Sequence, residues 1–160
     1  RFILFLALLP MLLFLFFFLQ TAVFSMAIAI ITASYNLIAI VNAVITTTVV
    51  TAALVLFAMQ SKINFSFLGA GLFTALFAFL IAGLFQVIFS LAFGYGRWFY
   101  LFYAAGGTVL FSLFLLFDTS RAMHVLKPDD YVEASVSIYL DVINLFLMIL
   151  ALFGRPDRSS

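Results

Sequence analysis

Three long stretches without a charged residue constrain this chain more than any other feature. They cover residues 2–61, 63–96 and 98–117. Each reaches or exceeds the ~20 apolar residues with which a helix crosses the hydrocarbon core of a bilayer. The stretches do not alternate between polar and apolar residues, as the strands of a membrane barrel must. The sequence therefore predicts an all-α fold, a polytopic membrane helix bundle.

The composition agrees with a protein embedded in lipid. Hydrophobic residues make up 68% of the chain and charged residues 8%, with a mean hydropathy of +1.34, which is far from a water-soluble domain. A net charge of +1 without a basic run argues against a nucleic-acid partner. With no cysteine and only one histidine, His124, a zinc or haem site built on those residues is excluded. We expect the lipid bilayer as partner and no cofactor.

Breaks in the apolar pattern predict five complete membrane helices. Pro10 and the polar cluster at 34–36 are the best punctuation near the N-terminus, so residues 1–9 are expected to form a stub or a partial sixth helix. An alternative break at 20–21 would give three spans before residue 60. The five helices are predicted near 11–33, 37–59, 65–93, 98–120 and 130–153.

The chain is expected to form one transmembrane bundle over residues 1–154, followed by a polar tail at 155–160. A solvated loop is predicted at 119–134, where most of the charged residues gather. The distribution of Lys and Arg weakly favours a cytosolic position for this loop and for Lys62. The bacterial plasma membrane, the endoplasmic reticulum and the mitochondrial inner membrane are not distinguished.

Two carboxylates interrupt the apolar segments and are the candidate functional residues. Asp118 follows the run 98–117, and Asp141 lies inside the last predicted helix. A lone carboxylate in hydrocarbon costs several kcal/mol, so such a residue normally faces a partner or a hydrated path. Ser137, Asp141 and Asn144 share one helix face, since they fall at i, i+4 and i+7. We expect this supporting polar face to point into the bundle.

The loop 119–134 returns the chain to the same membrane side, so Asp118 and Asp141 are predicted to approach each other. Two adjacent carboxylates in low dielectric cannot both be charged cheaply, which favours a shared proton and a pH switch. Their oxygens also suit calcium, but two fall short of its usual six to eight ligands. Transient calcium passage is therefore expected instead of tight binding. The alternative for Asp118 is a helix-end residue solvated by lipid headgroups.

A second polar stripe lies on the predicted helix 37–59. Asn42 and Thr46 are four residues apart, as are Thr47 and Thr51. Buried threonines commonly return hydrogen bonds to their own helix, and asparagine commonly holds helices together. Packing is the first interpretation of this stripe, and a hydrated path is the second.

Several of these segments resemble a known family. The residues Phe-Asp-Thr at 117–119 and the string SIYLDVINLF at 137–146 are similar to the carboxyl-terminal signature of the Bax-inhibitor/Lifeguard family. The segments 43–48 and 56–62 resemble that family's fourth span and its following loop. The resemblance implies a seven-helix bundle with the last helix in its centre. It also implies a pH-sensitive calcium leak controlled by an aspartate pair, here Asp118 and Asp141, and a link to suppression of cell death in eukaryotes.

Two departures from the family pattern affect these expectations. Counterparts of the first helix and most of the second are missing, so the chain is expected to be a fragment or a reduced relative. The family's arginine near the end of its second helix has only Arg1 as a counterpart. Other membrane subunits are possible suppliers of the missing parts.

The sequence thus favours a pH-sensitive calcium leak with a di-aspartate switch. The alternative is a structural subunit of a larger membrane complex, which keeps the helices without conduction and docks through surfaces rich in its 23 phenylalanines. An enzyme is not expected, because no catalytic motif accompanies the two aspartates.

Overall fold

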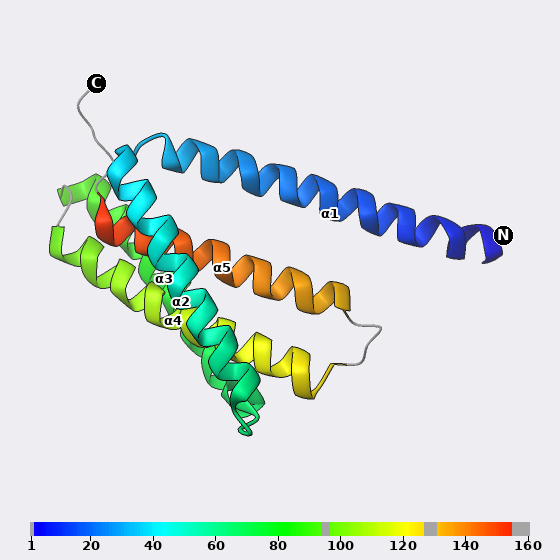
Figure 1. Cartoon of the computed structure of the whole chain (residues 1–160). Coiled ribbons are helices and arrows are strands. Elements are labelled where there is room, and N and C mark those ends of the chain that lie inside the picture. The colour runs from blue at the N-terminus through cyan, green and yellow to red at the C-terminus, as the bar shows by residue number, and fades with distance from the viewer. Residues whose placement is uncertain (1, 94–96, 127–130, 155–160) are drawn as a thin grey trace. The chain divides into compact units, whose positions relative to one another are not determined.

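Every segment that the structure describes is a helix or a connection between helices. The computed structural model describes residues 2–93, 97–126 and 131–154. Within these ranges it contains no strand, which confirms the predicted all-α class. The elements in chain order (Figure 1) are α1 (Phe2–Thr32), α2 (Leu37–Gln60), the 3-10 helix η1 (Phe65–Leu68), α3 (Gly69–Phe93), α4 (Arg97–His124) and α5 (Tyr131–Phe153).

Among the residues that the structure describes, four helical segments are long and apolar enough to cross a membrane. They comprise α2, α3 together with η1, α4 and α5, and they contain 23 to 28 residues each. At ~1.5 Å per residue, each exceeds the ~30 Å hydrocarbon core of a bilayer. The described side chains of α1 contribute a shorter apolar stretch, Phe18–Thr32. A polytopic helical membrane protein is therefore confirmed, and four of the five expected spans are identified among the described residues. The expected span at 11–33 falls partly on side chains outside the described set and stays a prediction.

The first helix continues through Pro10, where a break was predicted. Its backbone is helical without interruption from Phe2 to Thr32, so both the separate stub at 1–9 and the alternative break at 20–21 are wrong. Proline removes one backbone hydrogen bond, but ending the helix in an apolar segment would leave several more backbone groups unpaired. The less costly solution is to keep the helix on both sides of the proline.

The polar cluster at 34–36 does end α1, as predicted. The N–H of Ser34 donates to the carbonyl of Ile31 at 3.1 Å, and the N–H of Tyr35 donates to that of Thr32 at 3.0 Å. These i to i−3 bonds tighten the last turn and pair carbonyls that the helix end would otherwise leave open.

The run predicted as one helix at 65–93 begins instead as the 3-10 helix η1. The side-chain oxygen of Asn64 accepts a hydrogen bond from the N–H of Ser66 at 3.0 Å. Asparagine is a favoured N-cap because it satisfies such a donor at a helix start. The chain then passes into α3 at Gly69.

The chain divides into two compact units. One contains α1, and the other spans 37–155 with α2 to α5. The prediction of one bundle over 1–154 stays a prediction, and the expected tail at 155–160 lies outside the described residues.

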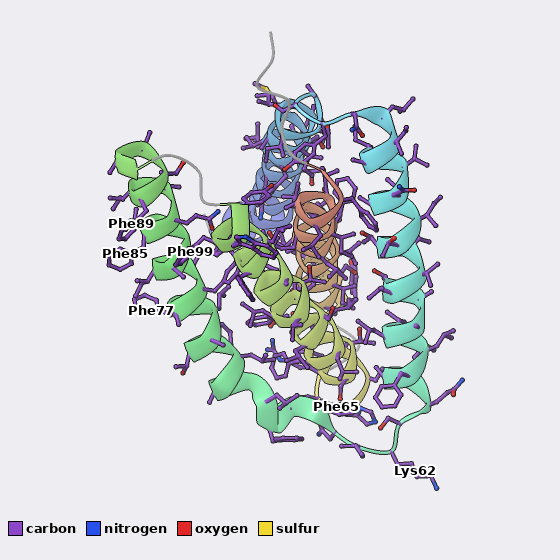
Figure 2. The ribbon with its side chains drawn as sticks, turned by 90° about the vertical axis from the view of Figure 1, so that its left-hand side faces the viewer. Lys62, Phe65, Phe77, Phe85, Phe89 and Phe99 are labelled. Atoms are coloured by element: carbon purple, nitrogen blue, oxygen red, sulfur yellow. The ribbon has the colours of Figure 1, made fainter. Side chains whose placement is uncertain are left out.

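Within the second unit, α4 and α5 share the interior (Figure 2). α4 packs against α2, η1, α3 and α5, while α5 packs against α2 and α4. Side chains are fully buried at Leu115 of α4 and at Leu145 and Leu150 of α5. The last helix, which the family resemblance places in the centre, thus shares the interior with the helix before it.

The helix α3 is the most exposed of the four spans. In its apolar 18-residue segment only 6% of the residues are buried, against 39% in the corresponding segment of α4. Phe77, Phe85 and Phe89 point away from the other helices in Figure 2, and each is more than half exposed. These side chains face lipid when the helix lies in a bilayer.

Candidate di-carboxylate site between α4 and α5

Asp118 lies inside α4, which is longer than predicted. The helix extends to His124 instead of ending near residue 120. Arg121 and His124 occupy its last turn, where positive charge interacts favourably with the helix dipole. The His124 ring lies 3.0 Å from the carbonyl of Ser120, so it pairs with one of the last backbone acceptors. The Asp118 side chain is half-buried.

Asp141 lies well inside α5 and is buried, with 6% of its surface exposed. The helix starts at Tyr131 and has Glu133 in its first turn, where negative charge is favourable. One oxygen of Asp141, Oδ2, is shielded from solvent and has no hydrogen-bond partner among the described residues. An unpaired carboxylate oxygen is costly in such a place.

The structure brings the two predicted site residues together. The side chains of Asp118 and Asp141 are within hydrogen-bonding reach of each other across the α4–α5 interface. A charged carboxylate has only acceptors, so a hydrogen bond between the two groups requires one proton on the pair. The geometry therefore suits a proton shared between two helices.

Ser137 and Asn144 lie on the predicted polar face of α5 and are part-buried. No hydrogen bond joins either side chain to Asp141 within the part of the chain that the structure describes. Both residues belong to the same stripe as Asp141, but the direct partner of that carboxylate is on α4.

The residues of the polar stripe on α2 differ in burial. Thr48, next to the stripe, donates to the carbonyl of Val44 at 2.8 Å. Thr47 is 5% exposed, and the hydroxyls of Thr47 and Thr51 are buried without a hydrogen-bond partner among the described residues. Asn42 is exposed.

Sequence reasoning missed an ion pair beside the aspartates. Arg121 Nη2 donates to Glu133 Oε1 at 2.7 Å. Both residues had been assigned to a solvated loop, since α4 was expected to end near residue 120. The sequence contained one indication that the helix continues. Arg121 follows Asp118 by three residues, a spacing that puts both side chains on one face of a helix extended past residue 120.

Residues for holding a metal ion are few. Among the described residues, no group of three or more His, Cys, Asp and Glu side chains is placed to hold one. Two carboxylates supply fewer oxygens than calcium usually takes.

Comparison with known proteins decides the family. The family model described as "Inhibitor of apoptosis-promoting Bax1" matches residues 6–158. The chain belongs to this Bax inhibitor family. Its similarity to named members extends over most of the chain, so the resemblance carried by the aspartate motifs is confirmed.

Relatives come from animals, a virus and a yeast. Mouse protein lifeguard 4 is 38% identical over 135 residues, which are 84% of this chain and 55% of the relative. The Golgi anti-apoptotic protein of Vaccinia virus (strain Lister) shows the same values. Bax inhibitor 1 of Schizosaccharomyces pombe is 33% identical over 146 residues, covering 91% of the chain and 53% of the relative. The chain thus spans about half the length of these relatives.

Proposed function

We propose that this protein is a pH-sensitive calcium leak whose switch is the Asp118–Asp141 pair. The observation that carries the proposal is the meeting of two carboxyl groups from different helices, one of them buried, in a bundle of apolar spans. Carboxylates so placed are costly and mark ion or proton paths in membrane proteins.

The switch works through the charge of the pair. With one proton shared, the pair carries about one negative charge, and the hydrogen bond holds α4 against α5. Loss of that proton leaves two negative charges in contact, and their repulsion loosens the helices. Flux should therefore rise with pH, and the exposed carboxylates then offer oxygen ligands to calcium during its passage.

Family membership supports a role in the control of cell death. One relative is named a Golgi anti-apoptotic protein, and the matching family is described by inhibition of apoptosis-promoting Bax1. The Golgi in the name of that relative supports an endomembrane as the proposed location of this protein. A calcium leak in such a membrane lowers the stored calcium, which is one physical route to such a role.

The test is calcium efflux from liposomes containing the purified protein between pH 5 and pH 8. Wild-type efflux should increase with pH. Asp141→Asn keeps the shape of the side chain but removes its titration, so this variant should flatten the pH dependence. Thr74→Val is a matched control on α3, since the Thr74 hydroxyl is exposed and bonds only to its own helix. It should titrate like the wild type.

An unchanged pH dependence in both Asp141→Asn and Asp118→Asn would rule out the switch. Wild-type liposomes that release no calcium would rule out the leak itself. That second result would favour the other candidate function.

The other candidate is a structural subunit of a larger membrane complex. The observation in its favour is α3, whose apolar segment is only 6% buried and presents large phenylalanines outward (Figure 2). Purification in mild detergent separates the two functions. A monomer that leaks calcium supports the first, whereas a chain that is stable only inside a large assembly and does not leak supports the second.

A further inference from the structure

Buried polar atoms without a hydrogen-bond partner gather on the three helices that pack against one another. Among the described residues, five buried side-chain oxygens lack such a partner. One is on α3, at Gln86, and the other four are on α2, α4 and α5, at Thr47, Thr51, Thr119 and Asp141. Each of these three helices packs against the other two. An unpaired polar group inside a bundle is costly, so this gathering calls for a polar ligand.

Thr47 and Thr51 lie on the inner face of α2. Ala39, Ala43 and Thr47 follow one another at intervals of four residues and are 3%, 0% and 5% exposed. Thr51 continues the series, since four residues bring a helix back to the same face. Because α2 packs against α4 and α5, the series faces these two helices (Figure 2). The two hydroxyls are therefore polar groups in an otherwise apolar contact.

The hydroxyls of Thr47 and Thr51 differ from those of three other threonines of the bundle. Thr48, Thr74 and Thr108 each donate to the carbonyl of the residue four positions earlier, at 2.8, 3.0 and 2.8 Å. Such a bond pairs a threonine hydroxyl within its own helix. Thr47 and Thr51 do not form it, although both hydroxyls are buried. Their partner must therefore come from outside α2.

Water is the ligand that fits these two hydroxyls. Residues four apart on a helix have Cβ atoms about 5 to 6 Å apart, and a water about 2.8 Å from each hydroxyl oxygen spans that gap. A hydroxyl both donates and accepts, so one water can pair with both threonines. Buried waters typically make about two to four hydrogen bonds. On the neighbouring helices, the hydroxyl of Thr119 and Oδ2 of Asp141 also lack a partner.

We propose that Thr47 and Thr51 bind internal water between α2 and its neighbours α4 and α5, and that this hydrated face is a section of the calcium route. The second part rests on the proposed leak. A cation that enters a pore exchanges its hydration shell for other oxygen ligands, and hydroxyls with their bound water supply uncharged ones. The inference thus adds a third helix to a site formed by two carboxyl groups on α4 and α5.

Water-edited solid-state NMR of the wild-type protein in lipid bilayers tests the hydration site. Magnetisation that starts on water should reach the side-chain carbons of Thr47 and Thr51 several-fold faster than those of Thr48. Thr48 is the matched control, because it follows Thr47 on the same helix, is exposed on the outer face and bonds to its own backbone. Equal transfer to the three threonines would overturn the inference. This measurement needs no variant, so it does not depend on how a substitution folds.

Calcium efflux from liposomes at pH 8 tests the role in the route. Valine keeps the shape of threonine without its hydroxyl. Thr47→Val/Thr51→Val should therefore lower the efflux rate about fivefold, the effect on a barrier of losing roughly one net hydrogen bond. Thr48→Val should leak like the wild type, and Thr47→Ser/Thr51→Ser, which keeps both hydroxyls, should recover most of the rate. A purely structural role of the two threonines predicts the reverse order, because serine loses the methyl group that valine retains.

The two measurements separate this inference from the proposed function. Wild-type liposomes that release no calcium would refute the leak and the route with it, while the NMR transfer still decides whether the threonines hold water. A leaking wild type would refute the inference alone if water transfer to Thr47 and Thr51 equals that to Thr48. Unchanged efflux in Thr47→Val/Thr51→Val would likewise remove α2 from the route and leave the leak standing.

Discussion

Two parts of the second unit have similar apolar sequences but different surroundings. The helix α3 has no charged residue and is nearly all exposed, with 6% of its apolar segment buried. The apolar segment of α4 is 39% buried, and this helix carries Asp118 and Arg121. The difference teaches that hydropathy identifies both as spans, while charged residues and packing together separate the lipid-facing helix from the one that holds the site.

The comparison has an energetic side. A bilayer is as apolar as leucine, so an exposed apolar side chain on α3 gains little from a neighbouring helix. Buried side chains of α4 and α5 instead contribute through close packing, which a truncation destroys. Substitutions of one residue type should therefore have unequal effects in the two regions.

The largest contrast is expected for leucine truncation. Leu115→Ala removes a fully buried side chain of α4 and should destabilise the protein by about 2 to 5 kcal/mol. Leu84→Ala, at a site on α3 that is 62% exposed, should stay within about 0.5 kcal/mol. Reversible unfolding in mixed detergent micelles measures both. Equal losses would mean that α3 is packed as tightly as α4.

A smaller contrast is expected for two adjacent glycines of α4. A Cβ at Gly107 would lie 2.5 Å from the Met148 sulfur and 2.7 Å from the Phe79 ring, whereas a Cβ at Gly106 would meet nothing within 4 Å. Gly107→Ala should cost about 1 to 3 kcal/mol through overpacking. Gly106→Ala should be neutral or stabilising, since alanine favours helix by ~1 kcal/mol. A stabilising Gly107→Ala in the same unfolding assay would contradict the close approach.

The smallest effect concerns the start of η1. The fully buried Ser120 hydroxyl accepts a hydrogen bond from the N–H of Phe65 at 3.0 Å. Ser120→Ala should cost about 0.5 to 1.5 kcal/mol through loss of this hydrogen bond, and it should speed hydrogen exchange at the Phe65 amide. Thr74→Ala, which removes an exposed hydroxyl on α3, serves as control. Unaltered exchange at Phe65 would show that the contact does not hold the connector.

Much of this architecture could be predicted from the sequence. The predicted helix 37–59 agrees with α2, and 130–153 with α5, each to within one residue at either end. The meeting of Asp118 and Asp141 was also expected, because the connecting loop returns to the same side and a buried carboxylate needs a partner.

The remaining features depend on backbone hydrogen bonding in an apolar setting and on contacts between distant residues, which local sequence patterns do not indicate. Pro10 was expected to separate a stub at 1–9 from a helix at 11–33. In an apolar segment the helix instead continues through the proline, because its backbone hydrogen bonds have no substitute there. The Arg121–Glu133 ion pair was missed because it requires α4 to extend past residue 120. The bond between Ser120 and the Phe65 amide links residues 55 apart in sequence, and no helical or strand period indicates such a contact.

The central claim is that Asp118 and Asp141 act as one titrating unit. Its most direct test is the carboxyl infrared titration of the wild type, Asp118→Asn and Asp141→Asn. The account predicts that either substitution removes the wild-type proton-release step or moves it at least about 1 unit toward lower pH, since the like charge at hydrogen-bonding distance is gone. A wild-type release step that persists unchanged in Asp118→Asn would contradict the account.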